Sequence, residues 1–177
     1  MKKTMAFFVV ALLFFSCESD DMPNSKKLII ESIDLNSDKK YDFKLNYSEF
    51  TTEDINHSAG EKFGEIIPID ENLILYDNMN GYLFLEKGDV IKKSNTENQQ
   101  WLPYGASVIS KKRIYEVWDE IWTVKSYLTE NYYLGIKLKN GSDEKLGWIK
   151  FEFNTSTGDV YILDSYVSSS NELVIEN

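Results

Sequence analysis

The strongest constraint on the fold is an alternation of apolar and polar residues near the C-terminus. Every second residue from Tyr132 to Leu138 is apolar, an Asn140-Gly141 pair follows, and the alternation resumes in the next segment. A period of two indicates a β-strand with one buried face, and Asn-Gly is typical of a tight hairpin turn. The pattern predicts an antiparallel hairpin. Its second strand directs Gly147, Ile149, Phe151 and Phe153 inward, and Trp148, Lys150 and Glu152 outward.

The rest of the body shows the same strand-like character. Short runs rich in Ile, Val, Tyr and Phe are separated by Gly, Asn and Asp, and no stretch holds apolar residues at helical spacing. These features predict a single all-β domain over residues 27–177, an antiparallel β-sandwich of the jelly-roll or immunoglobulin-like kind. The predicted strands are 27–33, 41–47, 71–76, 82–86, 106–110, 112–118, 121–128, 132–138, 146–153, 160–167 and 172–175.

Two further details concern the connections between these strands. An Asn80-Gly81 pair separates two apolar runs, 73–76 and 82–85, and predicts a second hairpin. The polar stretches 48–65 and 94–100 are predicted to be long loops.

The N-terminus has the features of an export signal. Lys2 and Lys3 precede an apolar stretch, from Met5 to Phe15, that is too short for a transmembrane helix, so residues 1–16 are predicted to be a signal peptide. Ser16-Cys17 resembles the lipobox of bacterial lipoproteins, in which the cysteine is lipidated and its new amine is acylated, for example with palmitate. This resemblance implies that Cys17, the only cysteine, anchors the chain to a membrane through a polar tether, residues 17–26.

Two more resemblances suggest where the protein is located. The acidic segment 18–21 resembles the export signal of surface lipoproteins in Bacteroidetes-type bacteria. Residues 133–138 (YLGIKL) and 146–151 (LGWIKF) resemble a paired Gly-Ile-x-Leu and Gly-Trp-Ile-Lys signature of surface β-sandwich proteins from such bacteria. The resemblances imply a β-sandwich on the bacterial outer membrane, facing outward, with the periplasmic face as the alternative. They imply no activity, because fold does not establish function.

Charge narrows the range of partners. With 19 basic and 29 acidic residues the chain has a formal net charge of −10 and lacks a basic stripe. Nucleic-acid affinity depends on basic residues that neutralise phosphates, so nucleic acid is not an expected partner.

An aspartate-rich segment suggests a calcium loop. Carboxylate, amide and backbone oxygens are the ligands that calcium prefers, and the segment offers them at alternate positions. The candidate ligands are Asp34, Asn36, Asp38, the Lys40 carbonyl and Asp42. The glycine and the bidentate glutamate of an EF-hand are replaced by Lys39 and Leu45, so an ion bound here would be a structural one in a shorter loop. The alternative is a solvated turn in which Asp and Asn bind the local backbone.

A second candidate site combines aromatic and acidic residues. In a regular strand Glu116, Trp118, Glu120 and Trp122 would share one face, which Trp148 could extend, and such a surface suits a glycan. The alternative is that Trp118 and Trp122 pack in the core, where large aromatic side chains are mostly found.

These features lead to one expected function and two rivals. The expectation is a membrane-anchored, non-enzymatic binding or accessory module for an extracellular ligand, such as a glycan, or for an envelope protein. The first rival is an extracytoplasmic carbohydrate-active hydrolase with paired carboxylates. Its carboxylates would have to converge in the fold, because Glu116 and Glu120 on one strand lie too far apart. The second rival is a structural subunit of an envelope assembly.

Overall fold

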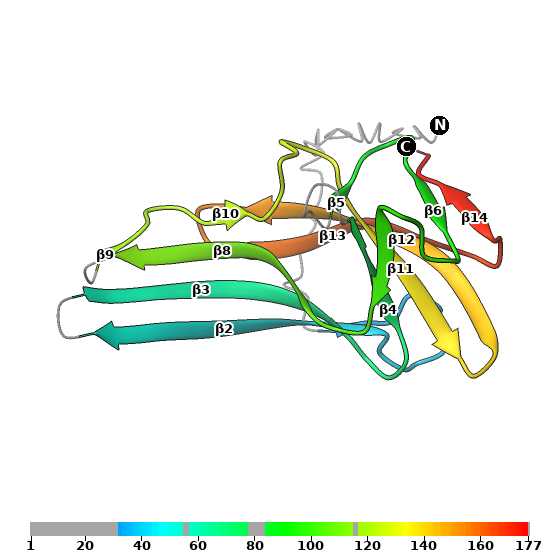
Figure 1. Ribbon diagram of the computed structural model, residues 1–177, viewed down its shortest axis with the longest axis horizontal. Helices are drawn as coiled ribbons and strands as arrows, with labels where there is room; N and C mark the ends of the chain where they lie inside the picture. The colour runs from blue at the N-terminus through cyan, green and yellow to red at the C-terminus, as the bar shows by residue number, and fades with distance from the viewer. Residues whose placement is uncertain (1–31, 55–56, 78–83, 115–116, 177) are drawn as a thin grey trace, which may run out of the picture.

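The computed structural model describes residues 32–54, 57–77, 84–114 and 117–176. These residues form an all-β fold of fourteen strands, as the sequence predicts, and every strand pairing is antiparallel (Figure 1). In the described part of the chain, no helix is long and apolar enough to cross a membrane. The strands form two six-stranded sheets, here called sheet A and sheet B, and one two-stranded sheet.

Sheet A has the order β1-β2-β3-β8-β10, with β9 also paired to β8. Its strands are β1 (Ser32–Ile33), β2 (Phe43–Asp54), β3 (His57–Pro68), β8 (Ala106–Ile114), β9 (Val117–Trp118) and β10 (Thr123–Val124). The ends of β2, β3 and β8 extend beyond sheet B at the left of Figure 1. We call this extension the arm.

Sheet B has the order β13-β12-β11-β4-β7, with β5 also paired to β11. Its strands are β4 (Leu73–Asp77), β5 (Phe84–Leu85), β7 (Gln99–Leu102), β11 (Tyr132–Asn140), β12 (Asp143–Asn154) and β13 (Asp159–Ser168). The predicted hairpin is confirmed, because β11 and β12 pair from Tyr132–Phe151 to Asn140–Asp143 around Gly141.

The main core lies between the two sheets. Sheet A contributes Phe43, Ile66 and Ile109, all at most 1% exposed, and sheet B contributes Leu134 and Ile149, both 0% exposed. The inward positions predicted for β11 and β12 are therefore confirmed. Burial of such side chains is the largest favourable contribution to a fold of this kind.

A second core covers the outer face of sheet B. Over this face lie β6 (Val90–Lys92) and β14 (Glu172–Val174), which pair with each other as the third sheet. Trp148, predicted to face outward, does leave the main core but is only 6% exposed, because it packs in this second core. The outward side predicted for Trp148 is therefore confirmed, but alternation along one strand does not show that another layer covers this side chain.

The prediction of a long loop at 48–65 is wrong. Residues 48–54 belong to β2 and residues 57–65 to β3, and these strands pair from Phe43–Pro68 to Asp54–His57. The segment lacks apolar alternation because the arm extends past sheet B, so its strands bury little apolar surface there. Cross-strand ion pairs replace core contacts in the arm. In one of them, Lys62 Nζ lies 3.4 Å from Glu49 Oε2.

Three other predicted segments also differ. The described part of the second predicted hairpin does not pair with itself, because β4 and β5 (Phe84–Leu85) each pair with β11, while residues 78–83 lie outside the described residues. Only Thr123–Val124 of the predicted strand 121–128 is a strand, and the predicted loop 94–100 ends inside β7. Only the last two residues of the predicted strand 27–33 are among those described.

Candidate functional site

The aspartate segment forms a curled loop between β1 and β2. Its backbone turns through two left-handed residues, Ser37 (φ 60°) and Lys39 (φ 70°). The Asp42 N–H donates to the Ile33 carbonyl over 2.7 Å and closes the loop. We refer to residues 34–42 as the aspartate loop.

The side chains of all four predicted calcium ligands with a carboxylate or amide group bind the loop's own backbone. Asn36 Oδ1 accepts from the Asp38 N–H at 2.9 Å, and Asp38 Oδ1 accepts from the Lys40 N–H at 2.8 Å. This is the solvated-turn arrangement given above as the alternative to a metal loop. Across the described residues, no three His, Cys, Asp or Glu side chains gather closely enough to hold a metal ion.

Asp34 differs from its neighbours. Its Oδ2 accepts from the Lys39 N–H at 2.9 Å, while its Oδ1 is buried and has no hydrogen-bond partner among the described residues. A buried carboxylate oxygen without a partner is costly, and a cation is one group that would satisfy it.

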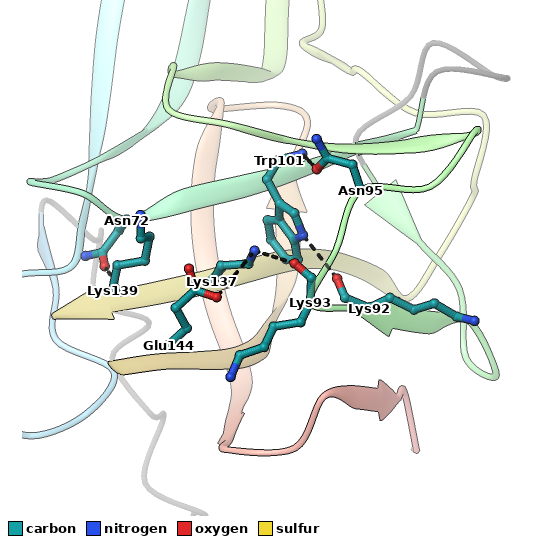
Figure 2. Close-up of polar contacts among 8 residues, drawn as sticks. All are labelled: Asn72, Lys92, Lys93, Asn95, Trp101, Lys137, Lys139 and Glu144. Carbon is teal, nitrogen blue, oxygen red and sulfur yellow. Dashed lines mark hydrogen bonds and ion pairs between the residues drawn. The ribbon is translucent and has the colours of Figure 1, made fainter. Parts of the chain in front are cut away.

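Asp42, the last predicted ligand, joins the loop to the body. The side chain is 6% exposed, and its Oδ2 accepts from the Leu35 N–H at 2.8 Å. Burial raises the pKa of Asp42, and the nearby Asp38 and Asp34 raise it further. Asn72 donates to the Asp42 carbonyl and accepts from the Lys139 N–H at 2.9 Å, so it links the loop to β11 (Figure 2).

A polar cleft of about 240 Å³ opens beside the loop. Three segments that are distant in sequence line it: the aspartate loop, the turn before β4, and the β11–β12 hairpin end. Its lining residues are Asn36, Asp38, Lys40, Tyr41, Asp42, Asp70, Asn72, Leu138, Lys139, Asn140, Asp143 and Lys145. The Tyr41 ring is 60% exposed. We call this the aspartate-loop cleft; it contains every predicted calcium-loop residue except Asp34.

Next to the cleft residues on β11, a buried lysine fixes the connection between β6 and β7. Lys137 is 5% exposed, and its Nζ donates to the Lys93 carbonyl at 2.5 Å. The same ammonium lies 4.6 Å from the centroid of the Trp101 ring and 4.0 Å from Glu144 (Figure 2). Trp101 Nε1 donates to the Lys92 carbonyl at 3.0 Å, so both side chains hold this connection against sheet B.

The buried lysine predicts a pH effect on stability. Burial lowers the pKa of Lys137 below its ordinary value of 10.5. Because the unfolded chain then binds this proton more tightly than the folded protein, the contribution of Lys137 to the free energy of unfolding increases as pH rises from that lowered pKa towards 10.5. We expect the difference in free energy of unfolding between the wild type and Lys137→Met, measured by urea unfolding, to shift in favour of the wild type over that range. A difference in free energy of unfolding that does not change with pH would contradict the prediction.

The predicted aromatic and acidic face does not form on one strand. Trp118 lies in β9 opposite Arg113, with Lys62 Nζ 4.6 Å and Arg113 Cζ 5.6 Å from its ring centroid. Its ring therefore already interacts with two of the protein's own cations. Glu120 lies in the exposed, non-strand segment between β9 and β10, and Glu116 lies outside the described residues, as does Cys17.

Trp122 joins the two sheets. Its N–H donates to the Thr155 carbonyl at 2.7 Å, and its ring packs against the main core. The ring lies edge-on to Tyr47, whose hydroxyl donates to the Gly158 carbonyl at 2.8 Å. Gly158 has φ 86°, and a Cβ at this position would overlap the Trp122 ring. Trp122 therefore packs against the core, which was the alternative to an exposed binding face. Because Trp148 lies in the second core and Trp118 in β9, the three predicted tryptophans do not form one surface.

Comparisons with protein-family models, curated proteins and solved structures give no significant match. The geometry of the chain itself is therefore the basis for a functional proposal.

Proposed function

We propose that the protein is a membrane-anchored, surface-exposed lipoprotein that binds a glycan, without cleaving it, in the aspartate-loop cleft. The observation that carries the proposal is the cleft itself, a concave site in which an exposed aromatic ring lies beside convergent polar groups. Concave sites with a few directed polar groups are the usual form of small-ligand sites.

The chemistry of the cleft suits a polyhydroxylated ligand. Sugar hydroxyls both donate and accept hydrogen bonds, and the cleft offers carboxylate acceptors at Asp70 and Asp143 and ammonium donors at Lys139 and Lys145. Tyr41 adds a flat apolar surface of the kind that the C–H face of a sugar ring covers. Opposite charges in one small site favour a neutral ligand over a strongly ionic one.

The location of the protein is part of the same proposal. Its support is the apolar segment ending at Cys17, the acidic tether and the glycine signature, whose residues Gly135 and Gly147 lie on the central strands of sheet B. A lipid at Cys17 would hold the β-sandwich at the outer membrane, facing outward.

A glycan array tests the proposed function. The full chain in a polyoxyethylene detergent, which carries no sugar, should retain at least one glycan class and release it intact. Asp70→Asn should weaken retention, because it removes a charge but keeps a residue that tolerates the local φ of 56°. Asp164→Asn, on exposed β13, is the matched control. Absence of any bound glycan, or equal retention by Asp70→Asn, would contradict the proposal.

The hydrolase is the second candidate, and Asp42 is the observation that favours it. Burial raises the pKa of this cleft carboxyl, as in the general acid of many glycosidases. Both of its oxygens, however, accept hydrogen bonds from Leu35 and Asn72, which supports a structural role. New reducing ends after incubation with an array ligand would favour the hydrolase over the binding module.

We further propose that the aspartate loop holds a structural calcium ion, supported by the unsatisfied Oδ1 of Asp34. Asp34 would supply that oxygen directly. Asn36 and Asp38, after giving up their local hydrogen bonds, and the Lys40 carbonyl would complete the site. The ion would supply positive charge among carboxylates and thereby fix the wall of the cleft.

Thermal melting with calcium and with a chelator tests this ion site. Calcium at about 100 times its dissociation constant should raise the melting temperature by roughly 5 to 10 °C. The double variant Asp34→Ala, Asp38→Ala should lose the rise, whereas Glu97→Ala, an exposed acid outside the loop, should retain it. Equal melting temperatures with calcium and with chelator would contradict the ion site and indicate an ordinary turn.

A further inference from the structure

A second concave site lies at the β13 edge of sheet B, between β13 and β14. It has a volume of about 370 Å³ and includes Trp148 and Tyr166 in its lining. We call it the Trp148 groove. It shares no lining residue with the aspartate-loop cleft.

Strand register builds the aromatic part of this groove. Trp148 of β12 and Tyr166 of β13 are direct cross-strand partners, so their side chains lie on the same face of sheet B. Their rings stack with centroids 6.2 Å apart and an interplanar angle of 30°. Trp148 is held from below by Tyr133, whose ring lies edge-on at 5.3 Å, while Tyr166 is 50% exposed. The result is a rigid aromatic pair with one open side.

The charge of the groove has a single sign. Its lining contains two carboxylates, Glu172 and Glu176, together with hydroxyls from Ser168 and Ser170, and no lysine or arginine. Lys92 pairs with Glu172 Oε1 at 3.2 Å from outside the lining, and both side chains are largely exposed. No such pair engages Glu176 among the described residues.

We infer that the Trp148 groove binds an organic ammonium ion. The electron-rich face of an aromatic ring attracts a cation, and a nearby carboxylate adds a charge of the opposite sign. The aspartate-loop cleft differs because its lining mixes three lysines with four aspartates. The inference is independent of the proposed glycan-binding function, since it rests on a separate site.

Choline and its uncharged isostere 3,3-dimethylbutan-1-ol provide a matched pair of probes. Titration of the full chain, followed by tryptophan fluorescence and by ligand NMR, should give saturable binding of choline. The isostere should bind about tenfold more weakly or not at all, because it has the same shape without the charge. Equal binding of the two probes would overturn the inference and indicate an apolar site, and no saturation by choline would also overturn it.

Three variants place the binding in the groove. Tyr166→Leu should weaken choline binding about tenfold by removing the exposed aromatic face, and Glu176→Gln should weaken it several-fold while keeping the shape. Tyr104→Leu removes a tyrosine that is 69% exposed outside the groove and should leave binding unchanged. If Tyr104→Leu weakens binding as much as Tyr166→Leu, or if neither groove variant weakens it, the ammonium ion does not bind in this groove.

Discussion

Gly147→Ala is expected to destabilise the protein by about 3 kcal/mol, equivalent to a fall of roughly 6 to 12 °C in melting temperature. Gly147 is buried on β12 opposite Ile136 of β11. A Cβ at this position would overlap the backbone oxygen of Tyr166 and lie 2.8 Å from Ile136 Cδ1. A backbone oxygen in a paired strand cannot move aside without breaking the ladder, so the added methyl group must displace β13.

Gly88→Ala separates this clash from the general effect of replacing a glycine. A Cβ at Gly88 meets nothing within 4 Å, but the residue has φ 96°. Alanine there should cost about 1 kcal/mol through backbone conformation alone. Thermal melting and urea unfolding of both variants provide the measurement. A Gly147→Ala protein that melts within 2 °C of the wild type, about 0.5 to 1 kcal/mol, would contradict the close strand approach.

Lys137→Glu is expected to cost about 3 to 5 kcal/mol, because it buries a charge of the wrong sign. The new carboxylate would face the Lys93 carbonyl, the Trp101 ring and Glu144, all of which interact favourably with a cation. The variant should also release the β6–β7 connection from sheet B, so amide hydrogen exchange in this connection should increase.

Two variants calibrate this result. Lys137→Met keeps the apolar stem against Trp101 and leaves the Lys93 carbonyl without its donor, at a cost of about 1 to 3 kcal/mol. Lys87→Glu reverses the charge of an exposed lysine and should change stability by about 0.5 kcal/mol or less. If Lys137→Glu is no worse than Lys87→Glu, Lys137 does not have the buried contacts assigned to it.

The sequence pattern predicted the strands whose alternation reflects one buried face. The hairpin of β11 and β12 follows from alternation and from Asn140-Gly141, and the same alternation identifies Leu134 and Ile149 as core residues. The sequence predicted that Gly147 faces inward and placed it in a family signature, and the structure supplies a physical reason for a glycine in the closeness of β13.

The wrong predictions have a common physical cause. The sequence of one strand does not show which other sheet or segment covers each of its faces. Polarity over 48–65 suggested a loop because the arm extends beyond sheet B. The pattern around Trp148 gave its outward side but not its burial, because the second core lies on the other side of the sheet. The strand predicted through Trp122 is interrupted where this residue turns to contact the β12–β13 turn.

The candidate site was only partly predictable. Five of its residues belong to the aspartate loop, and the sequence pattern identified four of them by their alternating oxygens. Asp70 and Asn72, and the hairpin residues Lys139, Asp143 and Lys145, come from segments far along the chain. The hairpin residues adjoin the predicted Asn140-Gly141 turn, whereas Asp70 and Asn72 lie at the start of the predicted strand 71–76 with no turn signal. The long-range strand pairing was needed to bring them together.

The most direct test of the central claim is the affinity of the cleft for its glycan. Isothermal titration of the full chain with a glycan retained on the array should give saturable binding without cleavage. Tyr41→Ala should weaken that binding about tenfold, because it removes the exposed ring of the cleft. Tyr104→Ala, which removes an equally exposed ring elsewhere, should leave the affinity within about twofold of the wild type, or 0.4 kcal/mol. Equal affinity of the wild type and Tyr41→Ala would contradict glycan binding in the aspartate-loop cleft.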